Sequence, residues 1–384
     1  TVAEGTYALT KCIWLTNAVT VVGAGRDICK LTGSFSDRML VVANKGASVS
    51  GFTIQGGKFS VYGAGSGKVG SCGSGVLINE RGGAITDCRL TGATAGAHYQ
   101  LGAVAVLSKN GRITHCIVDS NNMSYGDTCW CAGLYVGSGL VENCLVKGNS
   151  AYKGGAVGVG ANGVVRNCTI VNNTVKNTCA GACVIATGGT FVNCTFLTNQ
   201  CAYGGGGVYA DAKSKCGGFT GCAFTSNRTT TWKDCHGGGG FMSSSDDNRT
   251  ILTDCVFNDN RSATYGTAAV RANLHGCVVT NHQVGSYVLL SCNLNGCTIV
   301  DNYCAEGNGV SCDAFRSDYG GDKAYTNANC IFIRNHVNWS YISNGKTVIN
   351  CTYLDNVGDS FNYACVVPDN FPVYNSVFAG NKIA

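Results

Sequence analysis

The sequence predicts an all-β protein whose short strands wind as a parallel solenoid, and three observations support this prediction. A Cys-centred motif returns along the 384 residues at intervals of 20 to 33 residues. A Gly-led segment with alternating apolar residues precedes most copies, and strict alternation is a strand pattern. Gly contributes 55 residues, Pro only 2, and charged residues 13% of the chain. Abundant Gly with so little Pro favours tightly turned β-structure over disorder.

The Cys-centred motif is clearest in "VVRNCTIVNN", which begins at Val164, and in "TFVNCTFLTN", which begins at Thr190. Its Cys recurs at eleven positions and predicts a stacked Cys ladder: Cys88, Cys116, Cys144, Cys168, Cys194, Cys222, Cys255, Cys277, Cys297, Cys330 and Cys351. Asn recurs five residues after most of these anchors and predicts an Asn ladder: Asn121, Asn149, Asn173, Asn199, Asn227, Asn260, Asn302, Asn335, Asn356 and Asn381. Phe52 takes the Cys position in an upstream copy, and a degenerate copy ends at Ser376.

Each repeat is predicted to be one coil of three short parallel strands. The first strand is Gly-led, as in "GSGVLI" and "CAGLYV", the second ends before the Asn–Cys bend, and the third begins at the Cys. A leucine-rich repeat would need several Leu per repeat, a calcium-binding roll would need repeated Gly-Gly-x-Gly-x-Asp, and a propeller would need a period of about 40 residues. The sequence lacks these signals. It therefore predicts a single right-handed parallel β-helix domain of about 13 coils over residues 1–384, with N-terminal coils in 1–60 and regular repeats in 61–384.

Stacking gives the two ladders their expected roles. Successive coils lie about 4.8 Å apart, so equivalent residues stand above one another. The Cys ladder is expected to fill a tight apolar corner, since buried Cys packs as a small hydrophobe. The Asn ladder is expected to turn the chain, since Asn tolerates left-handed backbone angles. Its amides are also expected to hydrogen-bond along the stack.

On these motifs the chain resembles the pectate-lyase-like β-helix superfamily, and it is similar to the repeat-rich bacterial surface and secreted proteins built on that fold. The resemblance runs from "GTYALT" at Gly5 to "FAGNKIA" at Phe378. It implies the fold but no single function, because this fold carries lyases, hydrolases, adhesins and phage spikes. It also implies a capping helix before "GTY", and "TVAEGTY" opens without one. The ends are therefore expected either to continue in a longer chain or to stack on other copies.

Fourteen of the 25 cysteines fall outside the ladder. Seven of them precede Gly-led strands and are predicted to form disulfides between neighbouring loops: Cys72, Cys129, Cys131, Cys179, Cys201, Cys235 and Cys304. Such bridges would belong to an oxidising, extracellular setting. Metal binding is disfavoured because the spacing of Cys129 and Cys131 is not that of a usual zinc pair. No metal and no cofactor are predicted.

The resemblance implies where catalytic residues would stand. Enzymes of this fold carry carboxylates for calcium and an Arg or Lys base on the outer face of one strand column. In this chain the Gly-led strands are expected to point one residue each outward, as an outward column: Leu77, Ala105, Tyr135, Gly158, Val184, Tyr209, Met242, Leu289 and Ser311. None is charged, so this face is predicted to be non-catalytic, and a register slip of one residue would exchange the two faces.

Two further groups of polar residues are candidates for a site. Asp246 and Asp247, near Arg249, form the densest acidic group, and a solvated turn is the favoured interpretation over a calcium or sugar-acid site. The Asn-x-Thr sequons at Asn167, Asn193 and Asn350 are explained by the repeat itself. The sequons taken as exposed candidate glycan acceptors are Asn122, Asn227, Asn248 and Asn338.

Charge and hydropathy reduce the number of functions and partners to consider. The net charge is +5 without a run of Lys or Arg, which disfavours nucleic acid and anionic membranes as partners. No stretch of 18 apolar residues predicts a membrane span. The predicted function is that of a non-catalytic structural protein, extracellular or at the cell surface, whose copies associate end to end as a filament or laterally through the outward column. The alternative is a carbohydrate-active lyase or hydrolase, or a sugar-binding adhesin, with polysaccharide as the partner.

Overall fold

A computed structural model describes residues 1–59, 72–94, 102–123, 131–152, 155–176, 184–186, 188–202, 204–210, 217–231, 237–245, 249–263, 266–284, 287–305, 309–312, 325–338, 341–344, 346–358, 367 and 372–383. Every regular element of these residues is a β-strand. The chain falls into two compact units, the first made of residues 1–195 and 199–201 and the second of residues 196–198 and 202–384. The predicted single domain stays a prediction.

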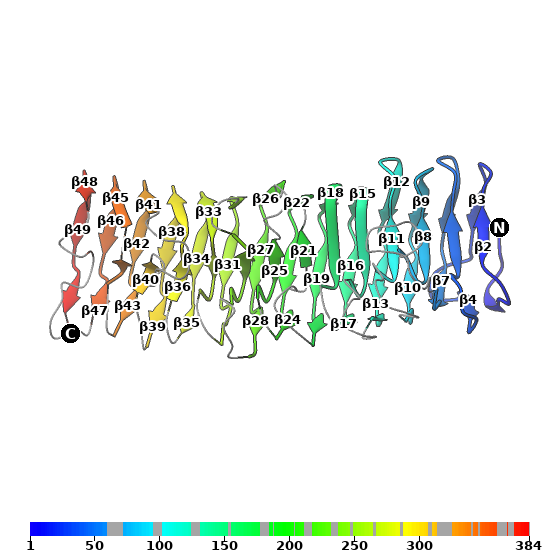
Figure 1. The fold of residues 1–384 in the computed structure, drawn as a ribbon, viewed down its shortest axis with the longest axis horizontal. Coiled ribbons are helices and arrows are strands. Elements are labelled where there is room, and N and C mark those ends of the chain that lie inside the picture. The colour runs from blue at the N-terminus through cyan, green and yellow to red at the C-terminus, as the bar shows by residue number, and fades with distance from the viewer. Residues whose placement is uncertain are drawn as a thin grey trace. The chain divides into compact units, whose positions relative to one another are not determined.

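The first unit repeats one coil pattern, drawn from blue to green in Figure 1. Its Cys-led strands form one parallel sheet: β1 (Gly5–Ala8), β4 (Cys29–Gly33), β7 (Thr53–Gly56), β10 (Arg89–Thr91), β13 (Ile117–Asp119), β16 (Leu145–Lys147) and β19 (Thr169–Val171). Its Gly-led strands are β2 (Ile13–Leu15), β5 (Leu40–Val42), β8 (Val76–Ile78), β11 (Val104–Val106) and β21 (Val184–Ala186), and its second strands are β3 (Thr20–Val22), β6 (Ser48–Ser50), β9 (Gly83–Thr86), β12 (Gly111–Thr114) and β22 (Thr190–Val192). In β15 (Leu134–Glu142) and β18 (Val157–Arg166) the two strands merge into one.

The second unit repeats the same pattern. Its Cys-led sheet holds β27 (Ala223–Thr225), β31 (Val256–Asn258), β34 (Val278–Thr280), β38 (Thr298–Val300), β42 (Ile331–Ile333), β46 (Thr352–Leu354) and β49 (Val377–Ala379), while β23 (Thr195–Leu197) spans the division of the units. Its Gly-led strands are β25 (Val208–Ala210), β29 (Phe241–Ser243), β32 (Ala269–Val270), β36 (Tyr287–Leu290), β40 (Gly309–Cys312) and β44 (Ser343–Asn344). Its second strands are β26 (Gly218–Thr220), β30 (Thr250–Thr253), β33 (Ala272–His275), β37 (Asn293–Asn295), β41 (Tyr325–Ala328), β45 (Lys346–Ile349) and β48 (Val373–Tyr374).

A fourth, two-residue strand follows the Asn ladder, where the sequence predicted three strands per coil. In the first unit these strands are β14 (Asn122–Met123), β17 (Ser150–Ala151), β20 (Thr174–Val175) and β24 (Gln200–Cys201). In the second they are β28 (Arg228–Thr229), β35 (Gln283–Val284), β39 (Tyr303–Cys304), β43 (His336–Val337), β47 (Val357–Gly358) and β50 (Lys382–Ile383). Period-two alternation cannot reveal a strand this short.

The core consists of columns of equivalent inward side chains. In the first unit, the register aligns Leu90, Val118 and Val146, all of them buried. The same position in the second unit carries aromatic rings that stack in parallel, with 4.7 Å between the centroids of Phe224 and Phe257. Such columns follow from parallel in-register pairing, which places residue upon residue at the coil spacing.

Two positions of the repeat take left-handed backbone angles in residues other than Gly, and neither is the position of the Asn ladder. Positive φ occurs directly before the Cys, as at Asp87 (55°) and Asn143 (53°), and four residues after it, as at Ser120 (54°) and Asn172 (53°). Asp, Asn and Ser occupy these positions because short polar side chains tolerate the left-handed region. The expectation that the Asn ladder turns the chain is therefore wrong by one residue, and the ladder has a hydrogen-bonding role instead.

The outward column is covered, so it is not the lateral contact surface that the sequence predicted. The register aligns Leu77 with Ala105 and Tyr135 in the first unit, and Leu77 and Ala105 are only 2% and 0% exposed. Cys12, Cys72 and Leu107 pack on this column. In the second unit Tyr209 and Met242 align, and Met242 is buried as well.

Three assignments to the outward column are wrong by one residue. The register pairs Val184 with Val157 and places residue 185 beside Gly158. It pairs Leu289 with Ala269 and with Ser311, whereas Leu290 continues the column of Met242. Leu289 and Ser311 therefore share the register of the inward-facing Phe241.

Candidate functional site

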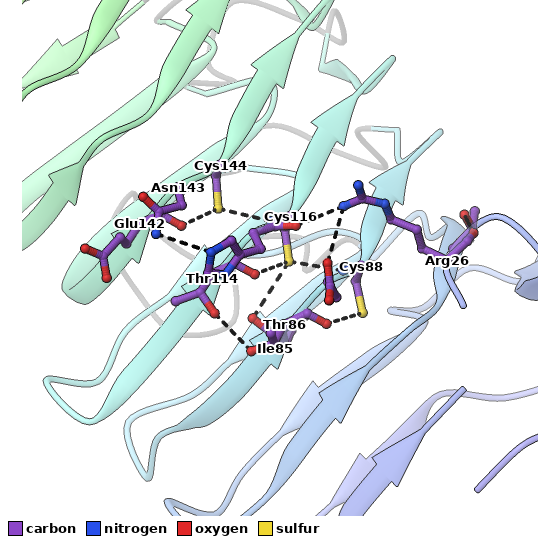
Figure 2. A network of polar contacts seen from close by, with 12 residues as sticks. Arg26, Ile85, Thr86, Cys88, Thr114, Cys116, Glu142, Asn143 and Cys144 are labelled. Carbon is purple, nitrogen blue, oxygen red and sulfur yellow. Dashed lines mark hydrogen bonds and ion pairs between the residues drawn. The ribbon is translucent and has the colours of Figure 1, made fainter. Parts of the chain in front are cut away.

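A network of polar contacts in the first unit gathers along the bend that precedes the Cys ladder (Figure 2). Asp87, His115 and Asn143 occupy this bend in three successive coils, with φ of 55°, 54° and 53°. We call these three residues the bend column. Because a left-handed bend selects short polar residues and His, the sequence collects hydrogen-bonding groups here without any functional requirement.

Arg26 ties the bend column together from a distant part of the sequence (Figure 2). Its Nη1 donates a hydrogen bond to the carbonyl oxygen of His115 at 2.9 Å and lies 3.8 Å from Oδ1 of Asp87. His115 Nε2 lies 3.4 Å from Nδ2 of Asn143. Arg26 and His115 are 89 residues apart in the sequence, so these contacts fasten the first coils of the unit to later ones.

The Glu142 carboxylate beside the bend column is held in the ionised form. Arg166 Nε lies 2.6 Å from Oε1 of Glu142, and this hydrogen bond holds the pKa of the Glu142 carboxyl below its usual value. Glycoside hydrolysis needs one carboxylic acid whose pKa is raised by its surroundings, and the surroundings of Glu142 have the opposite effect. The ion pair with Arg166 therefore suits a structural clamp.

The Asn ladder of the first unit is a continuous relay of amides. Asn149 Nδ2 donates to Oδ1 of Asn173 at 3.0 Å and to the carbonyl oxygen of Val118 at 3.0 Å. Its Oδ1 accepts bonds from the backbone N–H and from Nδ2 of Asn121, at 3.1 and 2.9 Å. Each ladder amide thereby satisfies polar groups of the coil on either side, which would otherwise be buried without a partner.

The Cys ladder has a parallel pattern of weaker bonds. The backbone N–H groups of Cys88, Cys116 and Cys144 each point to the sulfur of the next ladder Cys at 3.4 Å. Cys116 Sγ donates to the carbonyl oxygen of Thr114 at 3.3 Å, as Figure 2 shows. The register adds Cys29 to the Cys ladder, which the sequence did not suggest. Lys30, the residue after Cys29, pairs with Thr53, and Thr53 pairs with Arg89, the residue after Cys88.

The predicted loop cysteines lie in the core of the protein. Cys72, Cys131, Cys201 and Cys304 are at most 2% exposed, whereas bridges between surface loops were expected. Among the cysteines in the described residues there is no disulfide. Burial raises the pKa of the Cys304 thiol to about 12 and raises that of Cys131 further. The remaining three candidates, Cys129, Cys179 and Cys235, lie outside the described residues.

The other candidate residues give no clustered site. Asp246, Asp247 and Asn248 lie outside the described residues, and the guanidinium of Arg249 lies 4.3 Å from the ring centroid of Tyr325. Asn227 is wholly buried in the Asn ladder, so its assignment as an exposed glycan acceptor is wrong. Within the described ranges, no three His, Cys, Asp or Glu residues gather closely enough to hold a metal ion. The same residues contain no helix of the length and hydropathy that a membrane span requires.

Comparison with known proteins supports the fold. A family model described as a right-handed beta helix region matches residues 38–215, and together with the parallel sheets it confirms the predicted all-β, right-handed parallel β-helix. No curated protein matches the chain. The catalytic domain of a GH87 alpha-1,3-glucanase in complex with nigerose is 12% identical, with a TM-score of 0.31 over 99% of this chain and 64% of that one. The N-terminal fragment of gene product 12 of bacteriophage Phi29 is 13% identical, with a TM-score of 0.41 over 99% of this chain and 66% of that one.

The chain thus spans about 64% of the length of the glucanase domain that it matches.

One position of the Asn ladder was not predicted from the sequence. His282 stands five residues after Cys277, where the coils from Cys116 onward otherwise carry Asn. The spacing alone contained the signal that would have found it.

Proposed function

We propose that the protein is a non-catalytic structural β-helix, extracellular or at the cell surface, whose coils associate end to end with those of another copy. The observation that carries this proposal is the column of aromatic rings that stack from coil to coil in the second unit. The extracellular setting is the expectation of the sequence resemblance and remains part of the proposal.

In the second unit an aromatic column continues from coil to coil. The rings of Phe332 and Tyr353 stack at 4.6 Å, and those of Tyr353 and Phe378 at 4.9 Å, within 7° of parallel. The strands that carry these rings pair in parallel and in register, β42 with β46 and β46 with β49. Coils of two copies can be joined by the same pairing and stacking, because a coil of this fold contacts chiefly its neighbours.

The first unit carries an apolar column at the equivalent place in its coil. The register aligns Tyr7 with Leu31 and, through Ile54, with Leu90, which stands two residues after Cys88. Phe378 likewise stands two residues after Ser376, the Cys position of its coil. In the proposed end-to-end contact, Tyr7 of one copy would therefore stack on Phe378 of the next. This is a heterologous contact, and such contacts propagate as filaments when they do not close.

The proposal is tested by analytical ultracentrifugation over a wide range of protein concentration, together with electron microscopy. We expect association of the unmodified chain, and its loss in Tyr7→Asp and in Phe378→Asp, because a buried unpaired carboxylate is costly. Tyr374→Asp is the matched control, since Tyr374 is 55% exposed in the same coil and does not occupy the inward column. A monodisperse monomer at the highest concentration would overturn end-to-end association.

The same preparation tests the alternative, an enzyme or adhesin for polysaccharides. Incubation with a panel of polysaccharides, followed by assays for reducing ends and unsaturated products, measures hydrolase and lyase turnover. We expect no turnover. Sustained turnover would replace the structural proposal by an enzymatic one, whatever the state of association.

A further inference from the structure

One residue of the second unit interrupts the Asn ladder with an ionisable side chain. His282 lies between Asn260 of the preceding coil and Asn302 of the next, and it is wholly buried. Every other described residue in this column of the unit, from Asn227 to Asn381, is Asn. The position therefore has a defined hydrogen-bonding environment, built for an amide, in which the imidazole must fit.

The neighbouring amides determine which nitrogen of His282 carries the proton. Asn302 Nδ2 is engaged by Oδ1 of Asn335 at 2.9 Å and by the carbonyl oxygen of Val279 at 3.0 Å, so its Oδ1 faces His282. That Oδ1 accepts the backbone N–H of His282 at 3.1 Å and lies 3.0 Å from Nδ1. Nδ1 must therefore donate, since an acceptor needs a donor.

The other ring nitrogen then completes the relay. Nε2 of His282 lies 3.4 Å from Nδ2 of Asn260, and that amide nitrogen also donates to the carbonyl oxygen of Phe224 at 2.8 Å. In the neutral Nδ1–H tautomer, Nε2 accepts from Asn260 just as an amide oxygen would. The neutral imidazole thus continues the ladder, with a donor toward Asn302 and an acceptor toward Asn260.

Two described carboxylates flank the position of His282 along the chain, and each is paired with a guanidinium. On the preceding coil, Arg261 Nη2 lies 3.4 Å from Oδ1 of Asp259. On the following coils, Arg334 Nε lies 2.7 Å from Oδ1 of Asp301. Burial lowers the pKa of His282 to about 4, against the weaker opposing effects of the Asn302 bond and of the charge of Asp259.

We propose that His282 makes the second unit sensitive to acid. Protonation of Nε2 places two hydrogen-bond donors opposite each other, Nε2–H and Nδ2 of Asn260, and this opens the coil that runs from Cys277 to Asn302. The protonated ring keeps its bond to Asn302 but turns a second N–H toward the Nδ2 donor of Asn260. Because the ring is enclosed, no water replaces the lost acceptor. Opening of the coil lets the imidazolium reach solvent.

The expected pH dependence follows from linkage. In the opened coil His282 has its ordinary pKa, and in the closed coil its pKa is depressed. Above the ordinary pKa of about 6.5 the ring is neutral in both states, and pH has no effect. Below it, the opening equilibrium constant rises about tenfold for each pH unit until the depressed pKa is reached. Between pH 6.5 and 4.5 the opened population therefore grows about 40-fold, because half of the opened form is already protonated at pH 6.5 and the depressed pKa is near at pH 4.5.

Hydrogen exchange, corrected for intrinsic exchange rates, measures this opening. We expect the amides of β34 and β38 to lose protection by about 40-fold between pH 6.5 and 4.5 in the unmodified chain, and to keep it in His282→Asn, which carries the residue of the neighbouring coils. His275→Asn is the matched control, because it makes the same change at the half-buried end of β33, two residues before Cys277. It should respond to acid as the unmodified chain does.

An equal acid response of the unmodified chain and His282→Asn would overturn the proposal. A second measurement needs no variant at all. The nitrogen chemical shifts of the His282 imidazole should report the Nδ1–H tautomer at pH 7 and no protonation of the closed coil above pH 5. A titration midpoint of the His282 imidazole near pH 6.5 in the closed coil would also overturn the proposal. Neither result bears on end-to-end association, which is tested separately.

Discussion

The Asn ladder should be the most sensitive polar feature of the first unit, and Asn149→Ala tests its contribution. The substitution removes an amide that makes four hydrogen bonds, two to Asn121, one to Val118 and one to Asn173. The Asn121 backbone N–H and one hydrogen of its Nδ2 lose their acceptor, and the carbonyl oxygen of Val118 loses a donor. Asn121 is 1% exposed, so water does not take over these roles.

The magnitude follows from the groups left without partners. Each buried donor or acceptor left unsatisfied costs about 1–3 kcal/mol, and neighbouring groups are not additive, so we expect Asn149→Ala to lower the free energy of unfolding by about 3–5 kcal/mol. Guanidinium unfolding followed by far-ultraviolet circular dichroism measures the change. Asn162→Ala is the control, because Asn162 is exposed in β18 and should cost less than about 0.5 kcal/mol. Equal losses in the two variants, or a loss under 1 kcal/mol for Asn149→Ala, would refute the relay as a source of stability.

Three further predictions concern packing and thiol chemistry. Phe224→Ala removes a ring stacked 4.9 Å from Phe196 and should cost about 3–5 kcal/mol in the same unfolding assay; a loss under 1 kcal/mol would contradict the stacked core. Gly189→Ala should prevent folding, as judged by circular dichroism, because the added Cβ would collide with Val159 Cγ1. Gly148→Ala is the control, because its Cβ would enter open space. Only the φ of 59° at Gly148 is strained by a side chain, and this should lower the free energy of unfolding by about 1 kcal/mol. Burial raises the pKa of Cys12 to about 12, so its alkylation by iodoacetamide should be slow at pH 8 and rise about tenfold per pH unit up to pH 10; mass spectrometry showing the rate of an unfolded thiol would contradict this.

The repeating coil could be predicted from sequence because the fold is one-dimensional. Each coil contacts chiefly its neighbours, so a residue's environment depends on its place within the repeat and hardly on distant sequence. The register of Leu90 on Val118 and Val146 is therefore already present in the spacing of the Cys anchors. Cys29 escaped because Phe52 interrupts the Cys series after it and Ser34, not Asn, stands five residues on.

The covering of the outward column could not be predicted, and the reason is physical. Its burial in the first unit depends on Cys12, Cys72 and Leu107, residues that obey no repeat. The predicted register of the outward column was wrong where apolar and polar residues do not alternate. In "SYVLLSC" the residues Val288, Leu289 and Leu290 are all apolar, and an unbroken apolar run carries no phase. The contact of Arg26 with His115 joins segments with no sequence relation at all.

The exceptions to the two ladders reveal what each column requires. Ser376 replaces the ladder Cys, accepts the backbone N–H of Cys351 at 3.1 Å and donates to the carbonyl oxygen of Tyr374 at 2.8 Å. Its bonds are shorter than the 3.4 Å that the Cys116 sulfur makes with the N–H of Cys88. Because oxygen is smaller than sulfur, the shorter distances do not mean better geometry, but they show that a hydroxyl satisfies the same pattern. Hydrogen bonding alone therefore does not require Cys in the buried coils.

Solvation gives a physical reason for Cys in the buried coils. The ladder cysteines are at most 3% exposed, and a thiol loses less than a hydroxyl when it leaves water. The Asn column has the converse requirement, a donor on one side and an acceptor on the other in full burial. Neutral His282 meets it and the charged ring does not. The interior columns therefore tolerate a change of residue type wherever polarity and burial remain matched, and they become sensitive to solution conditions at the one described position where that match depends on a proton.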